Sequence, residues 1–218
     1  MVIPVKDDAE ALSRLLAQLC AFRDRGLEII VVDGGSSDGS AQVAHRAGVR
    51  LIESPSGRGL QLNTGVRSAI GDWIWMLHAD SQVTLAALTF IRSRRIPGWG
   101  RFDVAFEPAG SALSLVALFM NWRSRQTGIC TGDQGLFVHR RLLLRSGGVP
   151  EQPLMEDVEL SRRLKRLSPP VCPRIRVLTS SRRWRRDGVL RTIASMWVYR
   201  IRYWLGDSPE TLARDYYG

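Results

Sequence analysis

Residues 31–40 read VVDGGSSDGS, and this stretch decides the fold class of the 218-residue chain. The apolar run 27–32 stops at Asp33, a turn of small polar residues follows, and a helical pattern begins at Ala41. Open α/β sheets place such strand–turn–helix junctions, and their ligands, at the carboxyl ends of the strands. We expect Asp33 to accept hydrogen bonds from a ribose or base edge, and Gly34 to let a nucleotide approach the backbone. The alternative is an ordinary loop whose Ser and Asp side chains cap the helix.

Strands and helices alternate along the rest of the chain. Apolar runs predict strands at residues 2–5, 27–32, 50–53, 72–77, 100–106, 135–138 and 174–179. Helical spacing predicts helices at 12–19, 41–47, 85–94, 111–125, 157–167 and 189–205, and one more that the loop beginning at Gly57 enters. This order predicts an α/β fold with a mostly parallel central sheet flanked by helices, as a single domain with a C-terminal helical extension.

The chain is strongly basic, with 31 Lys and Arg against 21 Asp and Glu and a formal charge of +10. Thirteen basic residues and a single acid, Asp187, lie between Arg162 and Arg202. Arginine forks suit phosphate groups, so we expect anionic partners such as a nucleotide diphosphate, a lipid phosphate or a membrane surface. A solvated basic face without a partner is the alternative.

Three widely separated cysteines, Cys20, Cys130 and Cys172, form no CxxC motif, so neither a disulfide framework nor a zinc site is expected. A reducing compartment fits this pattern, and the expected location is the cytoplasm. No signal peptide is visible, and the longest apolar stretch, 112–120, is too short to cross a membrane. Membrane contact is therefore expected only at the inner face, through arginines and aromatic rings of helix 189–205. Docking of this helix on a partner or on the protein itself is the alternative.

Four further motifs follow the first one in a fixed order. They are GRGLQLNTG at 57–65, HAD at 78–80, GDQG at 132–135 and MEDVEL at 155–160. In this order and at these separations, the chain from Val2 to about Asp215 resembles the family 2 glycosyltransferases, and within them a small cytosolic-type bacterial branch. The resemblance implies a GT-A fold and transfer of a sugar from a nucleotide-sugar with inversion. It also implies a nucleotide-binding half at 1–80, a donor-sugar and acceptor half at 81–188, and C-terminal helices at 189–218.

The resemblance assigns a set of nucleotide-binding positions. These are Pro4, Asp33, Gly34, Arg58, Asn63, Ala79 and Arg183. Arg58 lies in a glycine-flanked loop that enters a helix, and both features suit phosphate or uracil oxygens. A surface loop with a helix cap is the alternative for Arg58 and Asn63. Arg183 belongs to a short Arg-Arg-Trp element whose arginine could assist or replace a metal at the diphosphate.

The HAD motif aligns with the metal-binding DxD motif of the family. Asp80 is therefore the expected ligand of a divalent cation that neutralises the two phosphates of the leaving group. His78 stands where the usual pattern has its first Asp, and imidazole binds Mn²⁺ better than Mg²⁺. The expected cofactor is Mn²⁺ or Mg²⁺. Packing of His78 beside the site, without metal binding, is the alternative.

Two acidic motifs in the second half carry the expected sugar chemistry. Asp133 and Gln134 offer a carboxylate and an amide to the hydroxyls of the donor sugar or the acceptor, and a tight turn is the alternative. Glu156 and Asp157 match the catalytic acid pair of the family, with Asp157 as the base that takes the proton of the acceptor hydroxyl. The helix that follows keeps this carboxylate ionised. Helix capping alone is the alternative.

The expected partners are a nucleotide-diphosphate sugar, with a UDP-sugar favoured, and an unknown hydroxyl acceptor, with no specific nucleic acid. A nucleotidyltransferase on a related scaffold is a competing hypothesis. It needs a glycine-rich loop with Lys at the start of the chain, and residues 2–8 contain none. A non-catalytic binder of polyanions or membranes is the other, and it leaves the acids at the strand ends unexplained.

Overall fold

The computed structural model describes residues 1–22 and 26–217. Three parallel strands, β1 (Val2–Val5), β2 (Ile30–Asp33) and β3 (Arg50–Glu53), pair in the order β1-β2-β3. Strands β4 (Trp73–Trp75) and β5 (Trp99–Gly100) lie on either side of the antiparallel β7 (Phe137–His139). A bridge between Val2 and Met76 joins the two groups beside β1. The parallel pair β6 (Asp103–Glu107) and β8 (Arg176–Ser180) completes the sheet structure.

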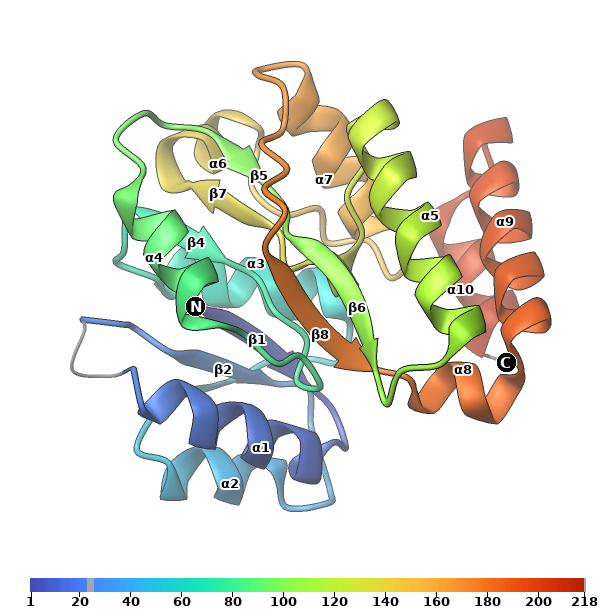
Figure 1. The fold of residues 1–218 in the computed structure, drawn as a ribbon. Coiled ribbons are helices and arrows are strands. Elements are labelled where there is room, and N and C mark those ends of the chain that lie inside the picture. The colour runs from blue at the N-terminus through green and yellow to red at the C-terminus, as the bar shows by residue number, and fades with distance from the viewer. Residues whose placement is uncertain (23–25, 218) are drawn as a thin grey trace.

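Helices surround these strands (Figure 1). In chain order they are α1 (Ala9–Cys20), α2 (Ser40–Arg46), α3 (Arg58–Ser68), α4 (Leu85–Ser93), α5 (Ser111–Thr127), the 3₁₀ turn η2 (Gly132–Gln134), α6 (Arg140–Arg145), α7 (Glu156–Lys165), α8 (Arg182–Asp187), α9 (Val189–Leu205) and α10 (Pro209–Tyr217). No helix among the described residues is long and apolar enough to cross a membrane.

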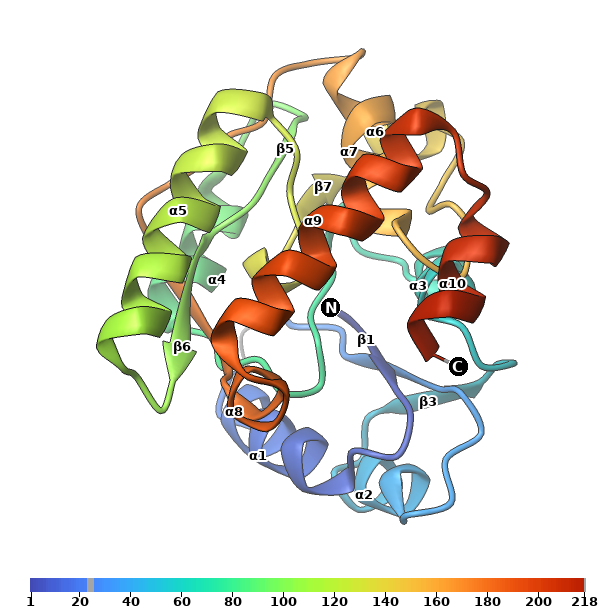
Figure 2. The same ribbon diagram turned by 90° about the vertical axis from the view of Figure 1, so that its right-hand side faces the viewer.

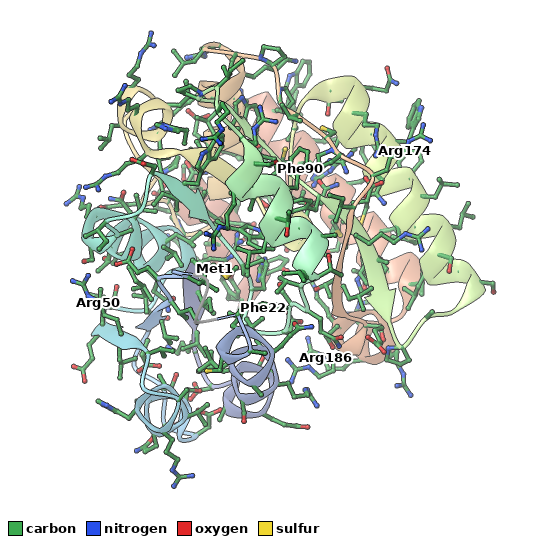
Figure 3. The ribbon with its side chains drawn as sticks, turned by 60° about the vertical axis from the view of Figure 1, so that its left-hand side comes forward. Met1, Phe22, Arg50, Phe90, Arg174 and Arg186 are labelled. Carbon is green, nitrogen blue, oxygen red and sulfur yellow. The ribbon has the colours of Figure 1, made fainter. Side chains whose placement is uncertain are left out.

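The central strands are buried on both faces, which explains why their sequences are apolar throughout. Ile3 and Val31 belong to the same core cluster as the leucines of α1, whereas Val2 and Val32 belong to the cluster that includes α3. Helix α3 lies close to the strands because Gly65 has no side chain: a Cβ there would meet Val2 Cγ1 at 2.4 Å. Figure 3 shows Met1 inside the molecule.

The α/β fold with helices around a largely parallel sheet is as the sequence predicts, with several local differences. The predicted strand 27–32 begins only at Ile30. The predicted strand 100–106 is two strands, because the fully buried Arg101 turns inward and donates from Nη2 to the Asn121 carbonyl oxygen at 2.8 Å. Helices α6 and α8 were not predicted, since each spans only six residues, whereas α10 lies in the segment 189–218 that was expected to be helical.

Candidate active site

The turn after β2 is organised by Asp33 itself. Its Oδ2 accepts hydrogen bonds from the N–H groups of Gly35 (3.2 Å) and Ser36 (3.0 Å), and its Oδ1 accepts one from the Ser36 hydroxyl (2.5 Å). The Gly34 N–H donates to the Val5 carbonyl at 2.9 Å. Pro4, on the neighbouring strand β1, is buried. The predicted nucleotide contacts Pro4, Asp33 and Gly34 therefore lie together at the carboxyl ends of adjacent strands.

A cleft of about 260 Å³ lies beside the first turn of α7, and α9 and α10 lie on this side of the molecule (Figure 2). Six residues predicted from the sequence line the cleft. They are Arg58, His78, Asp133, Glu156, Asp157 and Arg183. They come from five separate segments of the chain, and the fold brings all of them to one place.

Asp157 is the most firmly placed acid of the cleft. It lies in the first turn of α7, where its Oδ2 accepts a hydrogen bond from the Gly132 N–H at 2.8 Å and its Oδ1 accepts one from the Val158 N–H at 2.7 Å. Met155, which precedes α7, has a left-handed backbone with φ of +64°, an uncommon conformation for a residue other than glycine.

Glu156 is held by Arg58. The Glu156 side chain is buried, and its Oε1 accepts a hydrogen bond from Arg58 Nη1. Burial raises the pKa of Glu156, while the Arg58 charge opposes this shift. Arg58 Nε is buried without a hydrogen-bond partner among the described residues. The guanidinium predicted to contact the nucleotide therefore also neutralises a buried acid.

Gly132 allows these groups to meet. A Cβ on Gly132 would lie 2.2 Å from Arg58 Nη2 and 2.4 Å from His78 Nε2, so only glycine fits between the two side chains. Gly132 thus donates a backbone hydrogen bond to Asp157 and leaves space for the Arg58 side chain.

The predicted metal-binding residues lie beside a second acid. His78 Nε2 is 3.8 Å from Asp133 Oδ1. Burial, with a smaller effect of Arg58, lowers the pKa of His78 well below 6.5, so the imidazole is neutral. Burial and the neighbouring Asp133 raise the pKa of Asp80 to about 6, and burial also raises the pKa of Asp133. Within residues 1–22 and 26–217, no three His, Cys, Asp or Glu side chains are grouped closely enough to hold a metal by themselves.

A divalent cation fits this set of groups on chemical grounds. A cation would stabilise the charged forms of the desolvated Asp80 and Asp133 carboxylates, and the neutral imidazole of His78 offers a free nitrogen. A metal here would need further ligands from a diphosphate or from water, which is usual for Mg²⁺ and compatible with Mn²⁺.

Two predicted site residues use their amides inside the protein. Asn63 donates to Glu151 Oε1 (2.5 Å) and accepts from the Val149 N–H (3.3 Å). Gln134 is fully buried: its Oε1 accepts from the Thr131 N–H and its Nε2 donates to two other side chains. Neither residue lines the cleft, which corrects their expected contacts with nucleotide and sugar. Buried amides need internal partners, and the spacing of a motif does not show where these are.

The C-terminal helices contribute cleft residues that were not predicted. Tyr216 and Tyr217 of α10 and Tyr199 and Arg200 of α9 line the same cleft. The Arg183 guanidinium lies 5.0 Å from the centre of the Tyr216 ring, a cation–π contact. In the sequence, only the aromatic residues of the C-terminal segment pointed to such a role, and this pattern does not indicate which surface they cover.

Residues 1–89 match the family model described as glycosyl transferase family 2. A curated relative, TPR repeat-containing protein Synpcc7942_0270 of Synechococcus elongatus, is 37% identical over 92 residues, which are 41% of this chain. The matched segment of this chain covers 22% of that protein, about a fifth of its length.

Solved structures extend the likeness over nearly the whole chain. Mannosyltransferase PcManGT from Pyrobaculum calidifontis, in complex with GDP-Man and Mn²⁺, has a TM-score of 0.69 at 19% identity, over 96% of this chain and 65% of that chain. Glucosyl-3-phosphoglycerate synthase from Mycobacterium tuberculosis, in complex with Mn²⁺, UDP and phosphoglyceric acid, has a TM-score of 0.62 at 17% identity, over 91% of this chain and 76% of that chain.

The fold is that of GT-A glycosyltransferase structures, and residues 1–89 match the family 2 model. The predicted resemblance to family 2 is found in residues 1–89, and over the rest of the chain the similarity to solved structures concerns the fold. The match of residues 1–89 supports the expectation of a glycosyl-transferring enzyme.

Proposed function

We propose that this protein transfers a sugar from a nucleotide-diphosphate sugar to an acceptor hydroxyl by an inverting single displacement, with Asp157 as the base. The observation that carries this proposal is the fixed position of Asp157 in the cleft, between the Gly132 and Val158 N–H groups. Each carboxylate oxygen has about two lone-pair sites and accepts one of these hydrogen bonds, so each keeps one for a hydroxyl proton.

The proposed reaction forms one bond and breaks one. The acceptor oxygen attacks the anomeric carbon of the donor while Asp157 takes the hydroxyl proton. The bond from the anomeric carbon to the diphosphate breaks on the opposite face, and the nucleotide diphosphate leaves with the electron pair. Two N–H donors, from Gly132 and Val158, keep the carboxylate oriented during the transfer.

The nucleotide is proposed to lie over the strand ends, in contact with Pro4, Asp33, Gly34 and Ala79. Arg183 supplies positive charge to the diphosphate, and Tyr216 fixes the position of its guanidinium. Arg58 supplies further charge from within the acid cluster of Glu156, Asp157 and Asp133. A UDP-sugar is the favoured donor, and the similar structures that contain UDP or GDP-Man support a nucleotide-sugar in general.

A divalent cation would be held by Asp80 and His78, beside Asp133. When bound, it would neutralise charge on the departing diphosphate. The Mn²⁺ in the similar structures supports this part of the proposal.

Thermal unfolding with UDP, GDP, dTDP and ADP, each with and without Mn²⁺, tests the donor side of the proposal. We expect one nucleotide to raise the Tm, and Mn²⁺ to increase this shift in the wild type but not in Asp80→Ala. A Tm shift of the same size with and without Mn²⁺ would indicate that the arginines alone bind the diphosphate. No shift with any of the four would contradict a nucleotide-sugar donor.

A further inference from the structure

An apolar groove separates α5 from α9, two helices that lie next to each other in Figures 1 and 2. It encloses about 430 Å³, and most of its lining is apolar. These apolar residues are Leu115, Val116, Phe119 and Met120 of α5, Trp184 of α8, and Ile193, Met196 and Trp197 of α9. Leu115 is 67% exposed and Trp197 is 45% exposed, so part of the groove wall is open to solvent. At about 30 Å³ for a water-sized group, the groove has room for roughly fourteen methylene groups.

Two arginines, Arg123 and Arg200, also line this groove. Nε and Nη2 of Arg123 are buried without a hydrogen-bond partner among the described residues. Neither arginine has an acidic partner within 4 Å in the part of the chain that the structure describes. Buried guanidinium nitrogens without partners are costly, and an anionic ligand would satisfy them.

The groove continues into the proposed active site. Met196 and Arg200 line both the groove and the cleft that contains Asp157. Burial lowers the pKa of Arg123, and the charge of the nearby Asp157 carboxylate opposes this shift. A ligand in the groove would therefore have its charged end between the two arginines and could extend towards the carboxylate of Asp157.

We propose that the acceptor is a phospholipid-type amphiphile, whose alkyl chain occupies the groove between α5 and α9. Its phosphate is bound by Arg123 and Arg200, and its head-group hydroxyl reaches Asp157. The continuity of groove and cleft and the two unpartnered cations argue for this occupant. This inference rests on the proposed function, because it names the acceptor of that same site.

Binding of decyl phosphate and butyl phosphate to the whole protein, measured by calorimetry, tests the inference. Each buried methylene contributes about fourfold in affinity. We expect decyl phosphate to bind at least about tenfold more tightly than butyl phosphate, because only the longer chain fills the groove. Equal affinities for the two phosphates would overturn the inference.

Two variants separate the parts of the site. Arg123→Gln should lower the affinity for both alkyl phosphates by about tenfold or more, since it removes a charged hydrogen bond. The ratio of the two affinities should stay unchanged. Leu115→Gln should reduce the ratio, because it makes the groove wall polar. The matched controls are Arg95→Gln and Leu144→Gln, at exposed positions outside the groove, and we expect them to match the wild type within about twofold. Groove variants that behave like their controls would overturn the inference.

Three further outcomes are distinguishable. A wild type that binds a nucleotide diphosphate but shows no dependence on chain length contradicts the inference and leaves the proposed function standing. A wild type that sediments as a dimer, and that Leu115→Gln converts to a monomer, assigns the groove to a second copy and overturns the lipid. Failure to bind any nucleotide overturns the proposed function and the acceptor assignment with it.

Discussion

The Asp157 carboxylate accepts a hydrogen bond from the Gly132 N–H over 2.8 Å, and this contact ties the N-terminus of α7 to the segment before β7. The two residues lie 25 positions apart in the chain. Because the second carboxylate oxygen accepts a hydrogen bond from the Val158 N–H, the side chain has one defined orientation towards the cleft. A base held in this way needs little reorganisation to receive a proton.

Gly132→Ala should inactivate the enzyme. The new Cβ would lie 2.2 Å from Arg58 Nη2 and 2.4 Å from His78 Nε2, so both side chains must shift. Displacements of about 1 Å in an active site cost about 100-fold in rate, and we expect a loss of this size in kcat. The matched control is Gly110→Ala, whose Cβ would meet nothing within 4 Å. Equal kcat values for the two variants would contradict the close approach at Gly132.

Arg58→Gln should destabilise the protein, since it leaves the Glu156 carboxylate buried without a positive partner. We expect a loss of about 2–3 kcal/mol in the free energy of unfolding, reduced from the full value for a buried pair because Arg58 is partly exposed. The double variant Arg58→Gln/Glu156→Gln should recover part of this loss, as the unpaired charge is gone.

Urea denaturation measures these free energies. Arg14→Gln, which breaks an exposed pair with Glu10, is the control and should change stability by less than about 1 kcal/mol. A double variant no more stable than Arg58→Gln alone would show that the buried charge of Glu156 is not the cause.

The raised pKa of Asp80 predicts a dependence of stability on pH. Burial and the Asp133 and Asp8 carboxylates raise this pKa from 3.8 to about 6. The folded state then holds the proton more tightly than the unfolded state, so the free energy of unfolding falls as the pH rises from about 4 through about 6. Asp80→Asn avoids this loss, and we expect a gain of about 1–2 kcal/mol at pH 8, after allowance for partial exposure.

Denaturation in metal-free buffer at several pH values checks this expectation. The gain should shrink as the pH falls and vanish near pH 4. Asp72→Asn, at an exposed position, is the control and should show no such trend. An Asp80→Asn protein that matches the wild type at pH 8 would argue against a raised pKa of Asp80.

Tyr216→Leu should weaken binding of the donor and leave its chemistry intact. The ring holds the Arg183 guanidinium at 5.0 Å, and a cation–π contact of about 0.5–1 kcal/mol corresponds to roughly a two- to fivefold increase in KM. Trp204→Leu, at a position that is 80% exposed, serves as the control. If kcat falls and KM does not change, Tyr216 acts in the chemical step and this assignment is wrong.

The sequence indicates those parts of the fold and the site that local patterns determine. An acid after a buried apolar run predicts the end of β2 at Asp33, and an acidic pair before a periodic segment predicts the start of α7 at Asp157. The amide of Asn63 was misjudged because its partners Val149 and Glu151 lie more than 80 residues away in the chain. Tyr216 could not be predicted, since its ring reaches Arg183 only when α10 folds back over the cleft.

Release of nucleotide diphosphate from the sugar donor by Asp157→Asn tests the central claim most directly. Glu159→Gln is the matched control, because Glu159 lies on the same turn of α7 and pairs with Arg162 and Arg163 instead. We expect Asp157→Asn to lower kcat by about 10²–10⁴-fold while the nucleotide still raises its Tm, and Glu159→Gln to remain close to the wild type. Turnover by Asp157→Asn at the wild-type rate would contradict the assignment of Asp157 as the base.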